Sequence, residues 1–139
     1  SHFIGQGYTA AFDWPGTKDF AAYLSVGTAI DFRARFGEER IRDYCHGLAW
    51  QGLNLLRESW GGQLGSTEES LTFMGTVTLP GDHKPDQPSA DSLRRRLREE
   101  HEVEVEIKAF EGRLWVRACA YLYNDISDFE RLAAAAKAL

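Results

Sequence analysis

The fold is decided by residues Val103 to Tyr121, which read V-E-V-E-I-K-A-F-E-G-R-L-W-V-R-A-C-A-Y. Apolar and polar residues alternate on both sides of Glu111-Gly112, a pattern typical of two half-buried strands joined by a tight turn. The stretch therefore predicts a β-hairpin. With Glu111 and Gly112 in the turn, the register places Glu106 opposite Arg117, and opposite charges at facing positions can form an ion pair.

The segments on either side of the hairpin predict one more strand and two helices. Before the hairpin, apolar residues alternate with threonines over residues 70–79, which predicts a strand, and Ser89 is expected to cap a helix that reaches about Glu100. After it, Asp125 and Asp128 form an approximate capping box, so a last helix is expected to start near Asp125.

Two long helices are expected ahead of the sheet, over residues 18–36 and residues 39–60. Thr17 is the expected N-cap of the first helix. Gly27 and Gly52 fall inside these helices, where a glycine costs about 1 kcal/mol relative to alanine. Close helix packing is therefore expected at the two glycines.

The predicted order of elements is helix, helix, strand, helix, strand, strand, helix. This order predicts an α/β (α+β) fold, in which a small three-stranded sheet carries helices on one face. The chain is expected to divide into a glycine-rich loop at residues 1–16, the leading helices at residues 17–62, and a small α/β domain at residues 63–139. The leading helices are longer than three strands need, which indicates a lobe of something larger.

Composition argues against several classes of protein. Of 139 residues, 43% are apolar and 27% are charged, as in soluble globular proteins. The 16 basic and 21 acidic residues give a net charge of −5, which argues against general nucleic-acid binding. No apolar run approaches the roughly 20 residues that span a bilayer. The two cysteines make no disulfide framework, so a reducing, cytoplasmic location is expected.

Few residues form a recognisable catalytic or metal-binding pattern. The four histidines are scattered, without the spacing of metal ligands, so we expect no metal site. The sequence contains no Gly-x-Ser-x-Gly motif that would support a stand-alone hydrolase, and no P-loop follows a predicted strand. The basic run at residues 94–98 is interleaved with acidic residues four positions away, so a solvated, ion-paired helix face is expected. No residue is assigned as catalytic.

Two positions are candidate binding sites, and each has two interpretations. Gly16-Thr17, at the predicted helix start, either caps the helix or binds an anion such as phosphate. Arg117 either pairs with Glu106 across the strands or binds a substrate carboxylate through its two-pronged guanidinium. The residue patterns leave both alternatives open at both positions.

Two longer stretches together resemble a known family. They are F-D-W-P-G-T-K-D-F-A-A-Y-L at residues 12–24 and L-W-V-R-A-C-A-Y-L-Y-N-D-I-S-D-F-E-R-L at residues 114–132. This pair is similar to the C-terminal part of class V aminotransferase-like enzymes, which depend on pyridoxal phosphate, and especially to the isopenicillin N epimerase-like branch. The resemblance covers nearly the whole chain. It implies the C-terminal domain of a fold-type I pyridoxal phosphate enzyme.

The resemblance implies roles for both candidate binding positions. Gly16-Thr17 matches the Gly-Thr pair whose threonine reaches the cofactor phosphate of the neighbouring subunit. Arg117 matches the arginine that holds the substrate α-carboxylate. Tyr123 and Asn124 match a Tyr-Asn pair that is expected to position the turn from strand to helix. Two further matches concern single residues: Asp128 fits as a helix-capping aspartate, whereas the family pattern tends to carry serine where this chain has Cys119.

The family also has residues that this sequence does not show. Its enzymes bind pyridoxal phosphate through a lysine Schiff base, but Lys18, Lys84, Lys108 and Lys137 do not stand in the family's context for that lysine. The aspartate at the pyridine nitrogen and the aromatic residue stacked on the ring also belong upstream in the family. The chain is therefore expected to be catalytically inactive alone.

In this interpretation the chain is a truncated C-terminal portion. Residues 1–16 would enter from a missing large domain, residues 17–62 would be interdomain helices, and residues 63–139 would be the small C-terminal domain. The expected partners are that large domain, the second subunit of a homodimer and an amino-acid substrate. Neither nucleic acid nor a membrane is expected as a partner.

The reaction type stays open between two chemistries. Cys45 is expected in mid-helix and Cys119 in mid-strand, where neither reaches a substrate, so a cysteine desulfurase is disfavoured. Racemisation or epimerisation and C–S lyase chemistry both begin with loss of the α-proton, and both fit. The alternative is a free-standing small α/β binding or interaction domain without catalysis. An exposed apolar face on the leading helices favours the enzyme portion, and a polar face favours the binding domain.

Overall fold

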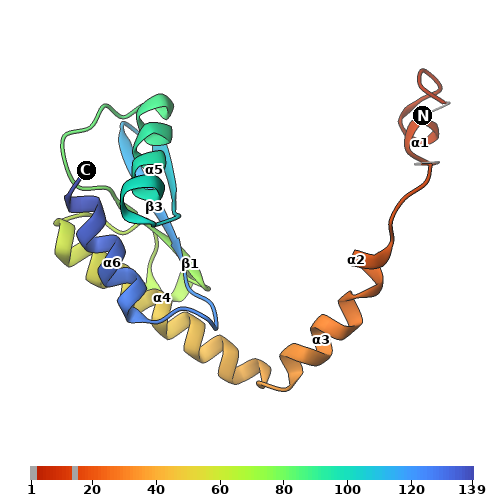
Figure 1. Cartoon of the computed structure of the whole chain (residues 1–139), viewed down its shortest axis with the longest axis horizontal. Helices are drawn as coiled ribbons and strands as arrows, with labels where there is room; N and C mark the ends of the chain where they lie inside the picture. Colours follow the sequence, from red (N-terminus) through yellow and green to blue (C-terminus); the bar gives the residue numbers. More distant parts are fainter. Residues whose placement is uncertain (1–2, 14–15) are drawn as a thin grey trace. The chain divides into compact units, whose positions relative to one another are not determined.

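The structure is a computed structural model that describes residues 3–13 and 16–139. It forms two compact units, one up to Gly37 and one over Glu38–Leu139, and each is described by itself (Figure 1). The expected boundary between residues 62 and 63 lies inside the second unit, because the preceding helix packs against the sheet.

The first unit consists of three short helices, α1 (Tyr8–Asp13), α2 (Ala21–Leu24) and α3 (Val26–Ala34). None of their residues is buried. The prediction of a loop over residues 1–16 is wrong where α1 forms, and residues 1–2 and 14–15 of that range lie outside the described part of the chain.

The single helix expected over residues 18–36 is also a wrong prediction, because a turn at Ser25 separates α2 from α3. The Ser25 hydroxyl donates to the Ala22 carbonyl at 2.9 Å, a local bond that competes with helix propagation. Thr17 does not cap α2: the Asp19 carboxylate instead accepts a hydrogen bond from the Ala21 N–H at 2.8 Å.

The second unit is a mixed fold with a three-stranded antiparallel sheet in the order β1–β3–β2. The predicted small sheet with accompanying helices is therefore confirmed. Its elements along the chain are α4 (Glu38–Trp60), a 3₁₀ turn η1 (Glu68–Ser70), β1 (Met74–Thr78), α5 (Gln87–His101), β2 (Glu106–Phe110), β3 (Arg113–Cys119) and α6 (Ile126–Lys137).

The hairpin forms as predicted. Glu111 and Gly112 both have positive φ, 48° and 69°, as a two-residue turn between twisted strands requires. The register pairs Glu106 with Arg117, which confirms the predicted alignment. β2 begins at Glu106 rather than near Val103, because the chain leaves α5 in a left-handed conformation and the Val103 N–H closes the helix on the Leu97 carbonyl.

One continuous core joins the three helices of the second unit to the sheet. Val77, Ile107 and Val116, one from each strand, are fully buried within it. The core also contains buried residues of α4, α5 and α6, so all three helices cover the same face of the sheet (Figure 1). The opposite face carries the exposed Arg117 and Cys119 of β3.

Glycine packing matches the expectation at one of its two positions. A Cβ built at Gly52 of α4 would overlap the Phe129 ring of α6, so the absence of a side chain allows these helices to approach closely. Gly27 of α3 has nothing within 4 Å of such a Cβ, so the expectation is wrong there.

Two helix starts in the second unit test the predicted caps. α5 is capped by Asp86, whose carboxylate accepts from the Ser89 N–H at 2.9 Å, so the cap predicted at Ser89 is wrong. The helix takes in Pro88 because proline fits the first turn, where its missing N–H is no loss. The capping box predicted at Asp125 and Asp128 is confirmed at the start of α6.

Candidate functional site

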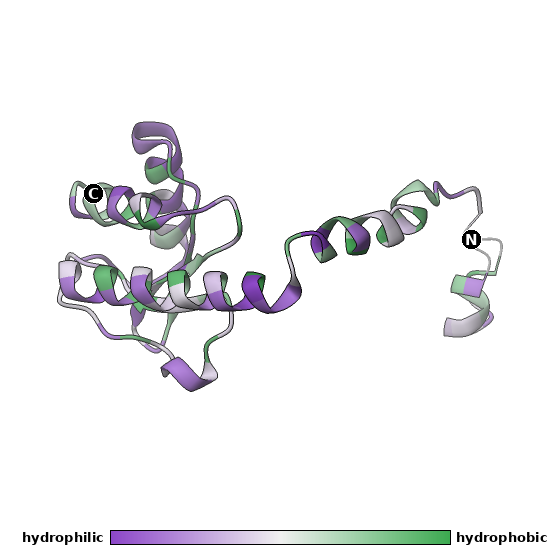
Figure 2. Ribbon diagram, turned by 90° about the horizontal axis from the view of Figure 1, so that it is seen from below, coloured by the Kyte–Doolittle hydropathy of each residue, from purple (hydrophilic) through white to green (hydrophobic). Residues whose placement is uncertain are grey.

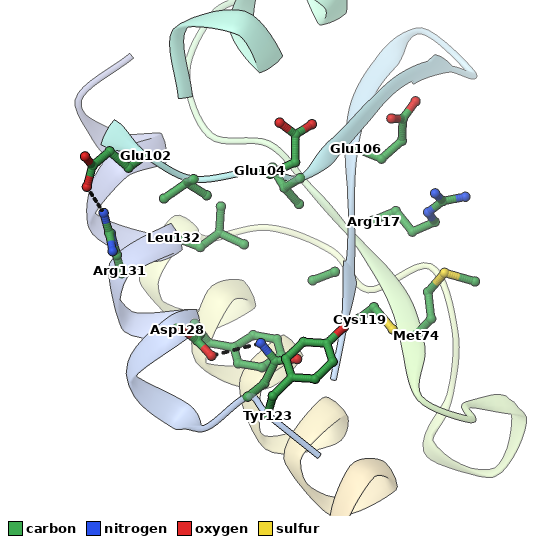
Figure 3. A pocket seen from close by; sticks show the side chains of 15 residues that line it. Met74, Glu102, Glu104, Glu106, Arg117, Cys119, Tyr123, Asp128, Arg131 and Leu132 are labelled. Atoms are coloured by element: carbon green, nitrogen blue, oxygen red, sulfur yellow. Dashed lines mark hydrogen bonds and ion pairs between the residues drawn. The ribbon is translucent and has the colours of Figure 1, made fainter. Parts of the chain in front are cut away.

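A cavity of about 650 Å³ opens at the end of β3 (Figure 3). It is lined by Met74 and by residues 102–106, 117–119, 123–124, 128–129 and 131–132. The cavity lies where the sheet is incomplete, because β2 pairs with β3 only as far as Glu106–Arg117 whereas β3 runs on to Cys119. Four separate segments of the second unit therefore meet around it.

Arg117 lines this cavity from β3 and is exposed. Figure 3 shows its side chain projecting to the same side of the strands as Glu106. The expected ion pair between the two is nevertheless not formed. Both carboxylate oxygens of Glu106 are taken by other cations: Arg94 Nη1 lies 2.7 Å from Oε2, and Lys108 Nζ lies 2.8 Å from Oε1.

The protonation state of Glu106 follows from its contacts with these two cations. The hydrogen bond from Lys108, and then the charges of Lys108 and Arg94, hold the pKa of Glu106 below its ordinary value, although partial burial acts in the opposite direction. The Glu106 carboxylate therefore stays ionised and satisfied without Arg117.

Within the described residues, no carboxylate pairs with Arg117, so its guanidinium is available to an external anion. The cavity's other arginine is engaged. Arg131 donates to Glu102 Oε2 at 2.9 Å and to the His101 carbonyl at 3.1 Å. A substrate carboxylate entering the cavity would meet Arg117 as the cation that has no carboxylate partner in the described part of the chain.

The turn between β3 and α6 forms the floor of the same region, and Asn124 holds it. Asn124 Oδ1 accepts from the Tyr121 N–H at 3.0 Å, and Asn124 Nδ2 donates to Asp128 Oδ2 at 2.9 Å. The Asn124 carbonyl also accepts from the Tyr44 hydroxyl of α4 at 2.7 Å. The Tyr123 side chain instead is 83% exposed, and its ring contacts the Tyr121 ring edge-on.

Replacing Asn124 by alanine is expected to destabilise the protein by about 1–3 kcal/mol, because the Tyr121 N–H loses its partner and the Asp128 carboxylate keeps only the bond from the Asp125 N–H. The free energy of unfolding in urea measures this. Asn54→Ala is a matched control, since its amide makes a single bond to the carbonyl one helical turn back. Equal losses in both variants would show that Asn124 does not organise the turn.

Gly16 and Thr17 belong to the first unit, where both are exposed. They do not stand at a helix start as expected, since α2 begins at Ala21. A role for Gly16 and Thr17 in binding a cofactor phosphate stays a prediction.

The described residues fit a substrate more readily than a covalently bound cofactor. Attachment of pyridoxal phosphate needs a lysine. No residue that lines the cavity is a lysine. Lys18 donates to the Tyr23 hydroxyl, Lys84 pairs with Asp86 and Lys108 pairs with Glu106. The described residues that line the cavity therefore offer a guanidinium to an anion and no lysine to a cofactor.

The cysteines lie partly as expected. Cys45 is buried within α4, in agreement with the prediction. Cys119 is not in mid-strand: it is the last residue of β3, is exposed and lines the cavity. It is held on a strand rather than on a loop. No group of three or more potential metal-ligating side chains occurs within residues 3–13 and 16–139.

Sequence reasoning missed Arg94 and Lys108, the two residues that hold Glu106. Arg94 belongs to the basic run that was expected to be a solvated, paired helix face. That expectation is confirmed for Arg96, whose guanidinium pairs with Glu100 at 3.1 Å. Lys108 stands two residues after Glu106 on the same strand face, and this alternation was the signal that could have revealed it.

The first unit exposes many large apolar side chains. Figure 2 shows apolar residues along α2 and α3. The exposed large apolar side chains of this unit are Phe3, Ile4, Tyr8, Phe12, Phe20, Tyr23, Leu24, Val26, Ile30, Phe32 and Phe36. An apolar surface of this kind is typical of a surface that contacts further protein, which fits a portion of an enzyme as well as an interaction domain. Within the described residues, no helix combines the length and the apolar character needed to cross a membrane.

Comparison with known proteins finds enzymes. A putative L-cysteine desulfhydrase of Oryza sativa subsp. japonica is 33% identical over 152 residues, which cover 95% of this chain and 31% of the relative. An isopenicillin N epimerase of Amycolatopsis lactamdurans is 29% identical, covering 89% of the chain and 30% of the relative. A hercynylcysteine sulfoxide lyase of Schizosaccharomyces pombe is 26% identical, covering 84% of the chain and 29% of the relative.

No family profile matches the chain. The chain spans about a third of the length of the curated relatives it matches. These relatives are class V aminotransferase-like enzymes and depend on pyridoxal phosphate. Over most of its length, the chain is thus similar to one third of a class V aminotransferase-like, pyridoxal phosphate-dependent enzyme.

Proposed function

We propose that this chain is the C-terminal portion of a pyridoxal phosphate-dependent enzyme that breaks the C–S bond of cysteine or of a cysteine-derived amino acid. In this proposal Arg117 binds the substrate α-carboxylate. The observation that carries it is the guanidinium of Arg117, which lines the cavity without a carboxylate partner among the described residues. The similarity to desulfhydrases and to a sulfoxide lyase supports the sulfur chemistry.

The role of Arg117 follows from its chemistry. A guanidinium presents two parallel N–H donors that match the two oxygens of a carboxylate. Holding the carboxylate at both oxygens fixes the orientation of the adjacent α-carbon, and orientation of this kind lowers the barrier to reaction. The chemistry that pyridoxal phosphate supplies when bound is an electron sink for that α-carbon.

Other parts of the site would come from outside the cavity. The lysine that binds the cofactor belongs, in this proposal, to a preceding large domain, and the exposed apolar side chains at residues 3–36 would pack against that domain or a second subunit of a homodimer. Gly16 and Thr17 would contact the cofactor phosphate across the subunit interface. A cytoplasmic location belongs to the same proposal.

The test uses the protein that carries this chain, supplied with pyridoxal phosphate and L-cysteine. We expect sulfide, ammonia and pyruvate in equal amounts, and a pyridoxyl group fixed to the protein by borohydride and visible in its intact mass. The 139-residue chain alone should show no saturable adduct, since no lysine lines its cavity. Absence of an adduct from the whole protein would contradict the proposal.

Epimerisation is the second candidate, and the similarity to isopenicillin N epimerase favours it. Both reactions remove the α-proton, so both exchange it with deuterium from the solvent. An epimerase would form the opposite enantiomer without releasing sulfide. Deuterium exchange with inversion and no sulfide would therefore favour the epimerase over the lyase.

A further inference from the structure

Two cationic side chains bind the carboxylate of Glu106, and a third stands opposite it in the sheet. Arg94 reaches it from α5, and Lys108 reaches it from the next residue on the same face of β2. Arg117 faces it directly in the register of β2 and β3. Facing residues of antiparallel strands have Cβ atoms about 4.5–5.5 Å apart, so a Glu106–Arg117 pair is within reach. The structure pairs Glu106 with the other two cations.

We infer that Arg94 and Lys108 are positioning residues for Arg117: by holding both oxygens of Glu106, they leave the Arg117 guanidinium free for a substrate carboxylate. The inference rests on the proposed function of Arg117 for its consequence in catalysis, whereas the competition for Glu106 is a property of this chain alone.

The surroundings of Arg117 explain why Glu106 is the carboxylate that matters. Across the other strand boundary Arg117 faces Thr76 of β1, which carries no charge. Its neighbours on the same face of β3 are Trp115 and Cys119. Glu106 is thus the acidic residue that faces Arg117 across the sheet, whereas Glu104, which also lines the cavity, lies 4.0 Å from Arg98.

The geometry of the edge strand makes the arrangement possible. β2 lies at the edge of the sheet, so an arginine of α5 can reach around it to the face that carries Glu106. The Glu106 side chain is 20% exposed, compared with 37% for Arg94 and 60% for Lys108. Its carboxylate is therefore the most enclosed member of the group, and a freed carboxylate at this place would turn to the nearest remaining cation.

The first test measures steady-state kinetics of the whole protein with Arg94→Gln and Lys108→Gln combined. We expect KM for the amino-acid substrate to rise roughly twofold to fivefold, the effect of one cross-strand charge pair, with kcat nearly unchanged. Adding Glu106→Gln to the double variant should restore KM. Arg96→Gln is the matched control, since Arg96 pairs with Glu100 on the same helix and should leave KM unchanged.

The second test needs no substrate. Urea unfolding of the 139-residue chain measures whether the effects of Glu106→Gln and Arg117→Gln are additive. We expect additive effects in the parent chain, and a non-additive shift of the midpoint once Arg94 and Lys108 are both glutamine. Coupling in the parent chain, or its absence in the double variant, would overturn the inference.

Different experimental results would contradict the inference and the proposed function. If Arg117→Gln leaves KM unchanged while coupling appears only in the double variant, the competition for Glu106 is supported and the proposed role of Arg117 is wrong. If Arg117→Gln raises KM but the double variant neither raises it nor shows coupling, the proposed function stands and the positioning role is wrong.

Discussion

Replacing Arg117 by glutamine in the protein that carries this chain is expected to lower kcat/KM roughly 30- to 5,000-fold, because truncating one partner of a hydrogen-bonded charge pair that the assembled site shields from water costs about 2–5 kcal/mol. Glutamine keeps a polar side chain at this position of β3 but removes the charge and the paired N–H donors. Steady-state kinetics with L-cysteine measures the loss. The kcat/KM of Arg117→Lys should fall between the values of the parent protein and of Arg117→Gln, since an ammonium binds a carboxylate as a point charge.

Arg113→Gln provides the control for this experiment. Arg113 lies on the same strand and is exposed, but its guanidinium bonds to Gln63 and it does not line the 650 Å³ cavity. Its replacement should leave kcat/KM within about twofold of the parent value, as for most surface substitutions. Similar losses at both arginines would mean that a general change of surface charge, and not the site, is responsible.

Replacing Gly52 by alanine is expected to destabilise the protein by about 1–3 kcal/mol, even though alanine is the better helix former. The new Cβ would overlap the Phe129 ring, which is 4% exposed and enclosed by the core between α4 and α6. To make room, the ring must shift within the core or push α6 away from α4, and either movement disturbs buried contacts. Urea unfolding of the chain measures the change.

Gly47→Ala is the matched control in the same helix. A Cβ at Gly47 has nothing within 4 Å, so this variant should gain up to about 1 kcal/mol from helix propensity. The two alanines are therefore expected to shift the unfolding midpoint in opposite directions. A gain in stability at both positions would show that the Gly52–Phe129 approach is not a tight constraint.

Much of the second unit could be predicted because its signals are local. Alternation over residues 103–121 and the positive-φ pair Glu111-Gly112 determine the hairpin and its register. The Asp125 and Asp128 carboxylates determine the start of α6. The helices of the first unit were harder to predict, because they bury no residue and no packing stabilises one continuous helix across Ser25.

The candidate site divides in the same way. Arg117 was proposed from its place on a strand, and the register correctly placed Glu106 opposite it. Whether Glu106 and Arg117 form an ion pair could not be deduced from the sequence, because the competing cation, Arg94, belongs to another element, the helix α5. Alternation alone places Lys108 on the same face as Glu106, but a strand pattern does not predict whether the Glu106 carboxylate pairs with Lys108 or with Arg117.

The sequence by itself determined the hairpin, its register, the start of the last helix and the position of Arg117, because each depends on residues close together in the chain. The tertiary structure decided that Gly52 lies against Phe129 and that Glu106 binds Arg94 and Lys108 instead of Arg117. Such contacts depend on how helices pack against one another and against the edge of the sheet, and that packing is settled by the whole core rather than by any one segment.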